Sequence, residues 1–486
     1  MRQAVMMRQL HVSWLIAGLM AGVVAGAALA IITQPPLTGS LLIICVLLLA
    51  GVGLHARRVW ALAPMLLCGI LLGIARGGDL QADLQKYEPF IGRTVTVAGT
   101  IAEDPSLAAE GEQRLRLRAV TIGDHKLPGI VWISTFEEVE FKRSDKVIFR
   151  GELSEGFGNL PASMWRAQLI NADRPTYADL PRQVRDDFAE DGAAKAIPEP
   201  EVNLAMGFLT GQKSALSPKL DEQLRLLGLT HVVVASGYNL TILVRFARGL
   251  LARRSKYLAL ASSLLMIAAF IGVTGASPSM ARAGLVAVLS LLAWYVGRNI
   301  HPAALLMIAA GATAFVQPSY AWGDLGWLLS FLSFAGVMLL APLIRDYFFA
   351  AKTGDNWIVR ILVETTSAQL MTLPLIVYVF GQYSPYALLA NLLILPLVPL
   401  AMLLTFVGGL LALAVTPLAI IFGFPATIVL TYMTSIVEWM ARLPGAAAEL
   451  TISLPVALLG YAALLAIGLY LWRATRHNFR RDNIID

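Results

Sequence analysis

The sequence predicts a polytopic α-helical membrane protein with one small all-β domain inserted near its N-terminus. Of its 486 residues, 57% are hydrophobic and 14% are charged, whereas charged residues make up about 25% of an ordinary soluble domain. Apolar runs long enough to cross a bilayer occupy most of the chain. The stretch 79–179 interrupts them with short runs of alternating polar and apolar residues, a pattern typical of β-strands.

Residues 1–78 are predicted to form an N-terminal membrane segment of three helices. The expected spans are 12–32, 41–54 and 59–75. Because cytoplasmic loops collect Lys and Arg, we place Arg57 and Arg58 in the cytoplasm, which sends the third span outward. Cys45 and Cys68 lie inside apolar runs and outside any CxxC pair, so no disulfide framework or Cys-based metal site is expected.

Residues 79–179 are predicted to form an extracytoplasmic β domain. Its five expected strands suit an oligonucleotide/oligosaccharide-binding (OB-like) barrel. In one strand Arg114, Arg116 and Arg118 alternate with leucines, so their side chains project from the same face. Such a row can follow a phosphate backbone. The alternative is a solvated strand face, and the excess of acidic over basic residues in this domain makes any contact with DNA local and weak.

Residues 180–229 are predicted to be a charged linker followed by amphipathic helices that lie along the membrane surface. Residues 230–486 are predicted to form the main transmembrane domain. Its expected spans are 230–250, 257–275, 280–297, 302–317, 325–344, 361–380, 386–413, 417–441 and 454–472. With the first three this makes about twelve spans, and the Lys and Arg of alternate loops place both termini in the cytoplasm.

One stretch interrupts an apolar run with polar residues at the point where the chain returns to the membrane. After His231 and a run of valines come Ser236, Gly237, Tyr238 and Asn239. An unsatisfied polar group in hydrocarbon costs several kcal/mol, so such a break needs protein or water around it. Transport proteins build binding sites from broken helices of this kind. The alternative is a Gly-kinked helix whose hydroxyl groups bond to their own carbonyls.

Other polar residues are also predicted to lie at or near membrane depth. They are Arg245, Arg282, Asp324, Ser330, Gln369 and Asn391. Intramembrane polar residues usually face the bundle interior or a wet cavity. Two cations beside amides and hydroxyls would suit the passage of an anionic, hydrogen-bonding polymer or solute. The alternatives are that Arg245 extends its charged end to the membrane surface and that several of the others only join helix to helix.

No pattern of a metal, cofactor or nucleotide site is found. None of the six histidines lies within four residues of another, so the spacings of hydrolytic zinc sites are absent. The run from Gly207 to Ser214 has the wrong spacing for a phosphate-binding loop and no strand before it. We therefore expect a chain that is not an enzyme and that needs no cofactor.

Several stretches, taken together and in order, resemble the motifs of the ComEC competence proteins. They are Gly228-Leu-Thr-His-Val-Val-Val-Ala-Ser-Gly237, Pro278-Ser-Met-Ala-Arg282-Ala, Gly326-Trp-Leu-Leu-Ser330-Phe-Leu-Ser, Ala368-Gln369-Leu-Met-Thr-Leu-Pro374, Phe380-Gly381 and Asn391-Leu-Leu-Ile-Leu-Pro396. That family comprises inner-membrane channels that admit single-stranded DNA during natural transformation. The β domain is placed like the external oligonucleotide-binding barrel of the family.

The resemblance implies a translocation path and a set of partners. The implied path residues are His231, Ser236, Gly237, Tyr238, Asn239, Arg245, Arg282, Asp324, Ser330, Gln369 and Asn391. Arg114, Arg116 and Arg118 would bind DNA in the β domain. The implied partners, besides the lipid bilayer and single-stranded DNA, are an external DNA-capture protein and a cytoplasmic helicase-type motor.

The chain also departs from the family pattern. Tyr238 and Asn239 stand where the family often has His, and Leu328 stands where Gln is usual. Fuller members add a C-terminal metallo-β-lactamase-like domain, whereas this sequence ends at Asp486 without a metal-ligand cluster. The resemblance therefore implies the channel half, and a nuclease is expected to be a separate protein.

Two other functions remain open from the sequence. The first is transport of another anionic or cell-envelope polymer, for which only Glu364 and Glu438 are candidate ion-coupling acids. The second is a membrane-embedded hydrolase that uses Ser236 or His231, although no paired base or acid is evident in the sequence.

Overall fold

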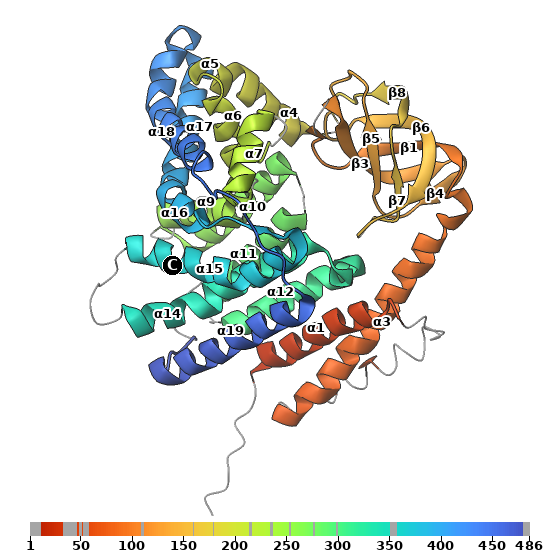
Figure 1. The fold of residues 1–486 in the computed structure, drawn as a ribbon, viewed down its shortest axis with the longest axis vertical. Coiled ribbons are helices and arrows are strands. Elements are labelled where there is room, and N and C mark those ends of the chain that lie inside the picture. Colours follow the sequence, from red (N-terminus) through yellow and green to blue (C-terminus); the bar gives the residue numbers. More distant parts are fainter. Residues whose placement is uncertain are drawn as a thin grey trace, which may run out of the picture.

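The computed structural model combines a β unit with a larger helical body, and helix α3 leads from one to the other (Figure 1). The structure describes residues 11–32, 46–47, 51, 58–107, 111–158, 160–177, 179–212, 216–233, 237–251, 254–275, 278–297, 300–349 and 357–479. The predicted span 41–54 lies mostly outside these residues, and the predicted site residue Ser236 lies wholly outside them. The side chain of Tyr238 also lies outside them.

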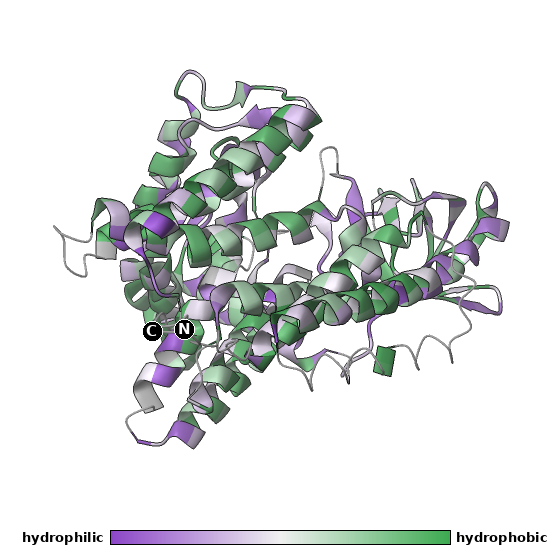
Figure 2. Ribbon diagram, turned by 90° about the horizontal axis from the view of Figure 1, so that it is seen from below, coloured by the Kyte–Doolittle hydropathy of each residue, from purple (hydrophilic) through white to green (hydrophobic). Residues whose placement is uncertain are grey.

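Eight described helical segments are long and apolar enough to cross a membrane, by length and composition. They are Val12–Leu29, Val59–Phe90, Lys256–Thr274, Leu325–Phe348, Ile358–Phe380, Ala387–Ala414, Thr416–Ala441 and Leu454–Thr475. Two shorter apolar helices are Ser279–Tyr295 and Pro302–Val316. Hydrophobic residues cover much of these helices (Figure 2). The prediction of a membrane-embedded helical protein is thereby confirmed, and the number of twelve spans stays a prediction.

The helices of the N-terminal part and the linker are α1 (Val12–Leu29), α3 (Leu62–Gln85), α4 (Leu180–Asp187), α5 (Ala194–Ala196), α6 (Glu201–Thr210) and α7 (Pro218–Leu226). A π-helical turn, η4 (Phe188–Ala193), joins α4 to α5. The next helices are α8 (Thr230–Val233), α9 (Gly237–Leu251), α10 (Lys256–Thr274), α11 (Pro278–Tyr295), α12 (Pro302–Val316), α13 (Leu325–Ala335) and α14 (Ala341–Phe348). The last are α15 (Trp357–Phe380), α16 (Ala387–Ile394), α17 (Val398–Ala414), α18 (Ala419–Ala441) and α19 (Leu454–Thr475).

Helices α13 and α14 form one continuous segment through a π-helical turn, η6 (Gly336–Leu340). Pro342 stands in the first turn of α14. Because proline has no backbone N–H and its ring crowds the preceding turn, the regular hydrogen-bond ladder cannot continue there. The π turn accommodates this break without ending the segment.

Helices α1 and α3 pack backbone to backbone along a row of glycines. A side chain added at Gly22 would collide with the carbonyl oxygen of Leu66, and one added at Gly69 would collide with that of Leu19. Small residues four positions apart allow such close approach between membrane helices. This packing fixes α3, which carries the β unit at its far end.

The β unit is a closed ring of strands around its own apolar core. The strands are β1 (Thr94–Ile101), β2 (Ser106–Leu107), β3 (Gln113–Ile122), β4 (His125–Leu127), β5 (Val131–Thr135), β6 (Lys146–Glu155), β7 (Ala162–Met164) and β8 (Gln168–Asp173). The ring order is β1-β3-β5-β7-β6, and β6 pairs back to β1. The pair β5–β7 is parallel and the others are antiparallel. Val97, Leu115, Leu117, Ile133 and Phe149 are buried in the core.

Two features differ from the sequence-based expectations. Helix α3 continues to Gln85, so the chain stays helical past the expected boundary at residue 79. Helix α6 is buried on most of its surface, including Leu204, Met206 and Phe208, and packs against α17 and α18. Helix α6 thus contributes to the helical core, whereas we expected an amphipathic helix; the placement of the linker along the membrane surface stays a prediction. Apolar residues make up most of α6, which explains its burial, because a largely apolar helix is stable only when surrounded.

Buried arginines dock the β unit onto the end of α10. Arg143 is 5% exposed; its Nε donates to Asp179 at 2.6 Å and its Nη2 donates to the Gly272 carbonyl at 2.8 Å. Arg185 pairs with Asp104 of the β unit and reaches the Val273 carbonyl at 3.5 Å. Cations at these last-turn carbonyls complement the helix dipole. Burial alone would raise the pKa of Asp179, but the hydrogen bond and charge of Arg143 lower it overall.

We expect Arg143→Met to loosen this docking. Removing one partner of a buried ion pair costs about 3–5 kcal/mol because the other charge stays buried alone. The variant should show a lower Tm in detergent and faster proteolysis between the β unit and α4. Lys195→Met is the matched control, since the Lys195–Asp191 pair is exposed and such pairs contribute about 0–1 kcal/mol. Equal Tm and proteolysis in the two variants would contradict the docking role.

Candidate functional site

Arg282 of α11 is buried inside the helical body with incomplete hydrogen bonding. The residue is 2% exposed, and its Nη2 donates to the carbonyl of Gly326 at 2.9 Å. Its Nε and Nη1 have no hydrogen-bond partner among the described residues. Asp324 and Tyr320 lie within electrostatic range of the guanidinium. A buried cation with two nitrogen atoms that lack hydrogen-bond partners is costly, so it is a candidate for binding an anion or its oxygen atoms.

Three helices converge beside Arg282 because small residues let them approach. A Cβ at Gly237, the first residue of α9, would lie 3.1 Å from the Cβ of Ala283 on α11 and 3.3 Å from the ring of Phe334 on α13. A side chain at Gly336 would collide with the backbone of Ser367, so α15 also packs close. The predicted site residue Gly237 therefore lies next to Ala283, the residue that follows Arg282 in the chain.

Asp324 begins α13 and caps it. Its Oδ1 accepts a hydrogen bond from the backbone N–H of Trp327 at 2.6 Å, which satisfies one of the free donors of the first turn. This cap fixes the start of α13 and so the Gly326 carbonyl that Arg282 contacts. The structure thus brings together three predicted site residues, Gly237, Arg282 and Asp324.

Two buried asparagines, both predicted site residues, have different surroundings. Asn239 is 0% exposed and its Nδ2 donates to the Phe208 carbonyl of α6 at 2.9 Å. Asn391 of α16 is 1% exposed, and neither its amide nitrogen nor its oxygen has a partner among the described residues. Asn239 therefore joins two helices, whereas Asn391 presents a free donor and a free acceptor within the protein.

The remaining predicted residues of the helical body lie in several places. His231 of α8 bonds through Nδ1 to the Gly228 carbonyl at 2.9 Å. Ser330 on α13 and Gln369 on α15 are partly buried. Arg245 of α9 lies within electrostatic range of Glu364, in a group separate from Arg282. Among the residues that the structure describes, no three His, Cys, Asp or Glu side chains are placed to hold a metal ion.

The arginine row of β3 points outward from the ring. Arg114, Arg116 and Arg118 are exposed, while Leu115 and Leu117 between them are buried. Two of the three arginines have acidic neighbours: Arg114 lies 2.9 Å from Glu112 and Arg116 lies 3.3 Å from Glu103. A hydrogen bond from Ser134 and the neighbouring Arg114 lower the pKa of Glu112. The row is therefore partly neutralised, as the acidic balance of this domain predicted.

Aromatic side chains that the sequence analysis did not single out lie beside this row. Trp132 of β5 is paired directly opposite Arg116 of β3. The rings of Trp165 and Phe157 lie 4.4 and 5.5 Å from that of Trp132, and both are about half exposed. The alternation of Val131, Trp132 and Ile133 could have placed the Trp132 side chain outside the ring. The neighbouring Trp165 and Phe157 come from other parts of the chain, so no local pattern reveals the cluster.

The short 3₁₀ helix η5 (Pro318–Trp322) connects the two regions. Tyr320 lies within electrostatic range of Arg116 and Glu103 of the β unit and also of Arg282 and Asp324. Burial raises the pKa of Tyr320, with smaller effects from these four charges. Charged groups of the β unit and of the Arg282 site therefore both act on Tyr320 of η5.

We expect substitution of the two asparagines by leucine to change stability in opposite directions. A buried polar group without a partner costs about 1–3 kcal/mol, so Asn391→Leu should raise the Tm. Asn239→Leu should lower it, because the Phe208 carbonyl is then left without its donor. Thermal unfolding of both purified variants in one detergent measures this. A lower Tm for Asn391→Leu would show that its amide is satisfied in the folded protein.

Comparison with known proteins gives one match. A family model described as competence protein matches residues 208–475, which is more than half of the 486 residues. Neither the curated proteins nor the solved structures give a match. The matched range contains the buried Arg282 and both asparagines, as well as the motifs that resemble ComEC. The chain therefore belongs to the competence protein family, and this membership indicates a role in competence DNA uptake.

Proposed function

We propose that the chain is an inner-membrane channel for single-stranded DNA in natural transformation and that it acts as a channel, not as an enzyme. The observation that carries the proposal is the placement of two guanidinium groups. Arg116 on the face of the β unit and the buried Arg282 both lie within electrostatic range of Tyr320. A strand with one phosphate per nucleotide needs such a series of contacts along its way.

The β unit would receive the strand on the face of β3, β5 and β7. Its closed five-strand ring with one parallel pair supports the assignment to the OB-like barrels, which bind oligonucleotides on their second and third strands. Exposed Trp165 and Phe157 offer surfaces for stacking bases, and Arg116 offers a contact for a phosphate. Stacking and positive charge are the two means by which proteins bind single strands without sequence preference.

Arg282 would contact the phosphates at membrane depth. Its Nε and Nη1 lack partners among the described residues, and each can donate to a phosphate oxygen. Asp324 nearby reduces the net positive charge. A strand would therefore bind and be released, as conduction requires.

The proposed location of the protein and its proposed partners follow from the channel function. The β unit lies outside the cytoplasmic membrane and both termini lie in the cytoplasm. An external DNA-capture protein delivers the strand, a separate nuclease removes its complement, and a cytoplasmic helicase-type motor supplies the driving force. The channel itself uses no cofactor.

We expect Arg282→Gln to abolish most DNA uptake. A hydrogen bond to a charged group contributes about 1.5–3 kcal/mol, and 1.4 kcal/mol corresponds to a factor of ten, so cytoplasmic label should fall about tenfold or more. Surface-bound DNA and the amount of protein in the membrane should stay unchanged. Arg282→Lys keeps the charge without the planar fork and should be intermediate.

Arg442→Gln is the matched control, since Arg442 is exposed and lies apart from this region. Normal uptake in Arg282→Gln cells, or in cells that lack the chain altogether, would overturn the proposal. That result would favour transport of another anionic or cell-envelope polymer.

We expect Trp165→Ala to weaken binding of single-stranded DNA by the full chain. Removing the ring on which one base stacks costs about 1–3 kcal/mol, which is roughly a five- to hundredfold rise in Kd. Fluorescence anisotropy with a labelled oligothymidine in detergent measures it. Tyr177→Ala is the control, because Tyr177 is 82% exposed and lies outside the ring of strands. The same Kd in both variants would remove this face from the proposed path.

A further inference from the structure

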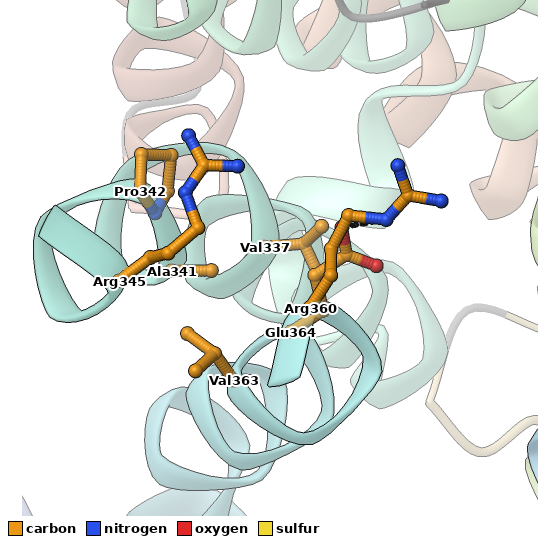
Figure 3. Close-up of a pocket in the computed structure, with 7 residues that line it drawn as sticks. All are labelled: Val337, Ala341, Pro342, Arg345, Arg360, Val363 and Glu364. Atoms are coloured by element: carbon orange, nitrogen blue, oxygen red, sulfur yellow. Dashed lines mark ion pairs between the residues drawn. The ribbon is translucent and has the colours of Figure 1, made fainter. Parts of the chain in front are cut away.

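A second group of arginines lines a cavity between α14 and α15. Arg345 of α14 and Arg360 and Glu364 of α15 border a cavity of about 50 Å³. Apolar side chains complete its wall, with both guanidinium groups at its border (Figure 3). A single water needs about 10–15 Å³ measured in this way. The cavity therefore has room for a group of several heavy atoms.

This cavity lies far from the Arg282 site along the same helical segment. Gly326, which contacts Arg282, and Arg345 both belong to the continuous segment Leu325–Phe348. At 1.5 Å per residue, the 19 residues between them correspond to about 28 Å. This is close to the ~30 Å thickness of the hydrocarbon core of a bilayer. Figure 1 shows α14 on the side of the helical body that faces away from the β unit.

The charges around the cavity are unbalanced toward the positive. Arg245, Arg345 and Arg360, from three different helices, all act on Glu364. The closest approach of Arg360 to Glu364 is 3.9 Å, and both side chains are about 40% exposed. A further carboxylate among the described residues, Asp346, lies 3.8 Å from Arg345 and bonds His477 at 2.6 Å. Glu364 thus lies within electrostatic range of three guanidinium groups, and its ion pair with Arg360 is long.

Arginines at the end of a membrane helix need no ligand when they only anchor it to the lipid headgroups. Two observations set this group apart. Arg345 and Arg360 border a cavity, and a carboxylate borders the same cavity between them. A long exposed ion pair contributes about 0–1 kcal/mol, so an incoming anion can replace Glu364 at little cost.

We propose that this cavity binds a phosphodiester group of the translocating strand at the far end of the channel, in exchange for the Glu364 carboxylate. The inference rests on the proposed function. Arg345 and Arg360 each donate to the phosphate oxygens, for which the planar guanidinium is well matched. Arg245 adds its charge from α9. The strand is then held by guanidinium groups at both ends of its passage through the membrane.

Binding of a fluorescein-labelled oligothymidine to the full chain in lipid-free detergent tests the proposal. Arg345→Gln/Arg360→Gln should raise Kd about tenfold or more, and should lower the slope of log K against log salt by about 0.7 for each phosphate that the variant no longer binds. Glu364→Gln should lower Kd, because it removes the competing carboxylate. If the Arg360–Glu364 ion pair only stabilised the fold, Glu364→Gln would not lower Kd. Arg473→Gln, at an exposed position in the last turn of α19, is the control.

An unchanged Kd in both the double variant and Glu364→Gln would overturn the inference. So would loss of bound phosphatidylglycerol in the double variant, measured by native mass spectrometry, with unchanged oligothymidine binding, because the cavity would then hold a lipid headgroup. The proposed function fails separately, if uptake does not depend on the chain or on Arg282. If uptake depends on Arg282 but is normal in the double variant, only the proposed site at the far end of the channel is ruled out.

Discussion

The burial of the Arg282 guanidinium is the constraint around which the helical body is arranged. A cation removed from water is tolerated only where acceptors and opposite charge surround it. The protein meets this with a carbonyl and a carboxylate from the start of α13, Gly326 and Asp324. That start is fixed by the cap of Asp324 on Trp327. Two nitrogen atoms of Arg282, Nε and Nη1, still lack partners among the described residues, which supports the proposed contact with an anionic ligand.

The position of the β unit matters because its β3–β5 face carries Arg116 beside partly exposed aromatic rings. Arg143 and Arg185 hold the unit through carbonyls at the end of α10. The same placement brings Arg116 and Glu103 within electrostatic range of Tyr320. A β unit joined only by a flexible linker would not keep that face beside η5. The buried arginine contacts therefore fix the position of the β unit relative to the helical body.

Local patterns in the sequence predict the helices and strands well. They do not predict contacts between residues that are far apart in the chain. The apolar run 302–317 corresponds to α12 at Pro302–Val316, and 417–441 corresponds to the segment Thr416–Ala441. The outward direction of the Arg114–Arg118 row follows from alternation alone. Sequence could not distinguish Asn239 from Asn391, because the difference lies in a carbonyl of α6, 31 residues away in the chain. The docking arginines and the cavity of Arg345 and Arg360 likewise depend on which helix ends meet in space.

The arginines of the proposed path share a chemical feature that bears on transport. Arg116 has Glu103, Arg282 has Asp324 and Arg360 has Glu364 as an acidic neighbour. A phosphate that reaches Arg116 or Arg360 would exchange with a carboxylate, and one that reaches Arg282 would lie near Asp324, so the net gain in binding would be small at each point. A polymer that carries a charge on every nucleotide would be immobilised by a series of unpaired arginines, since their contributions add along the strand. In the proposed channel, weak exchange at each contact would therefore allow a motor to draw the strand through, and the acidic residues would belong to the proposed path as much as the basic ones do.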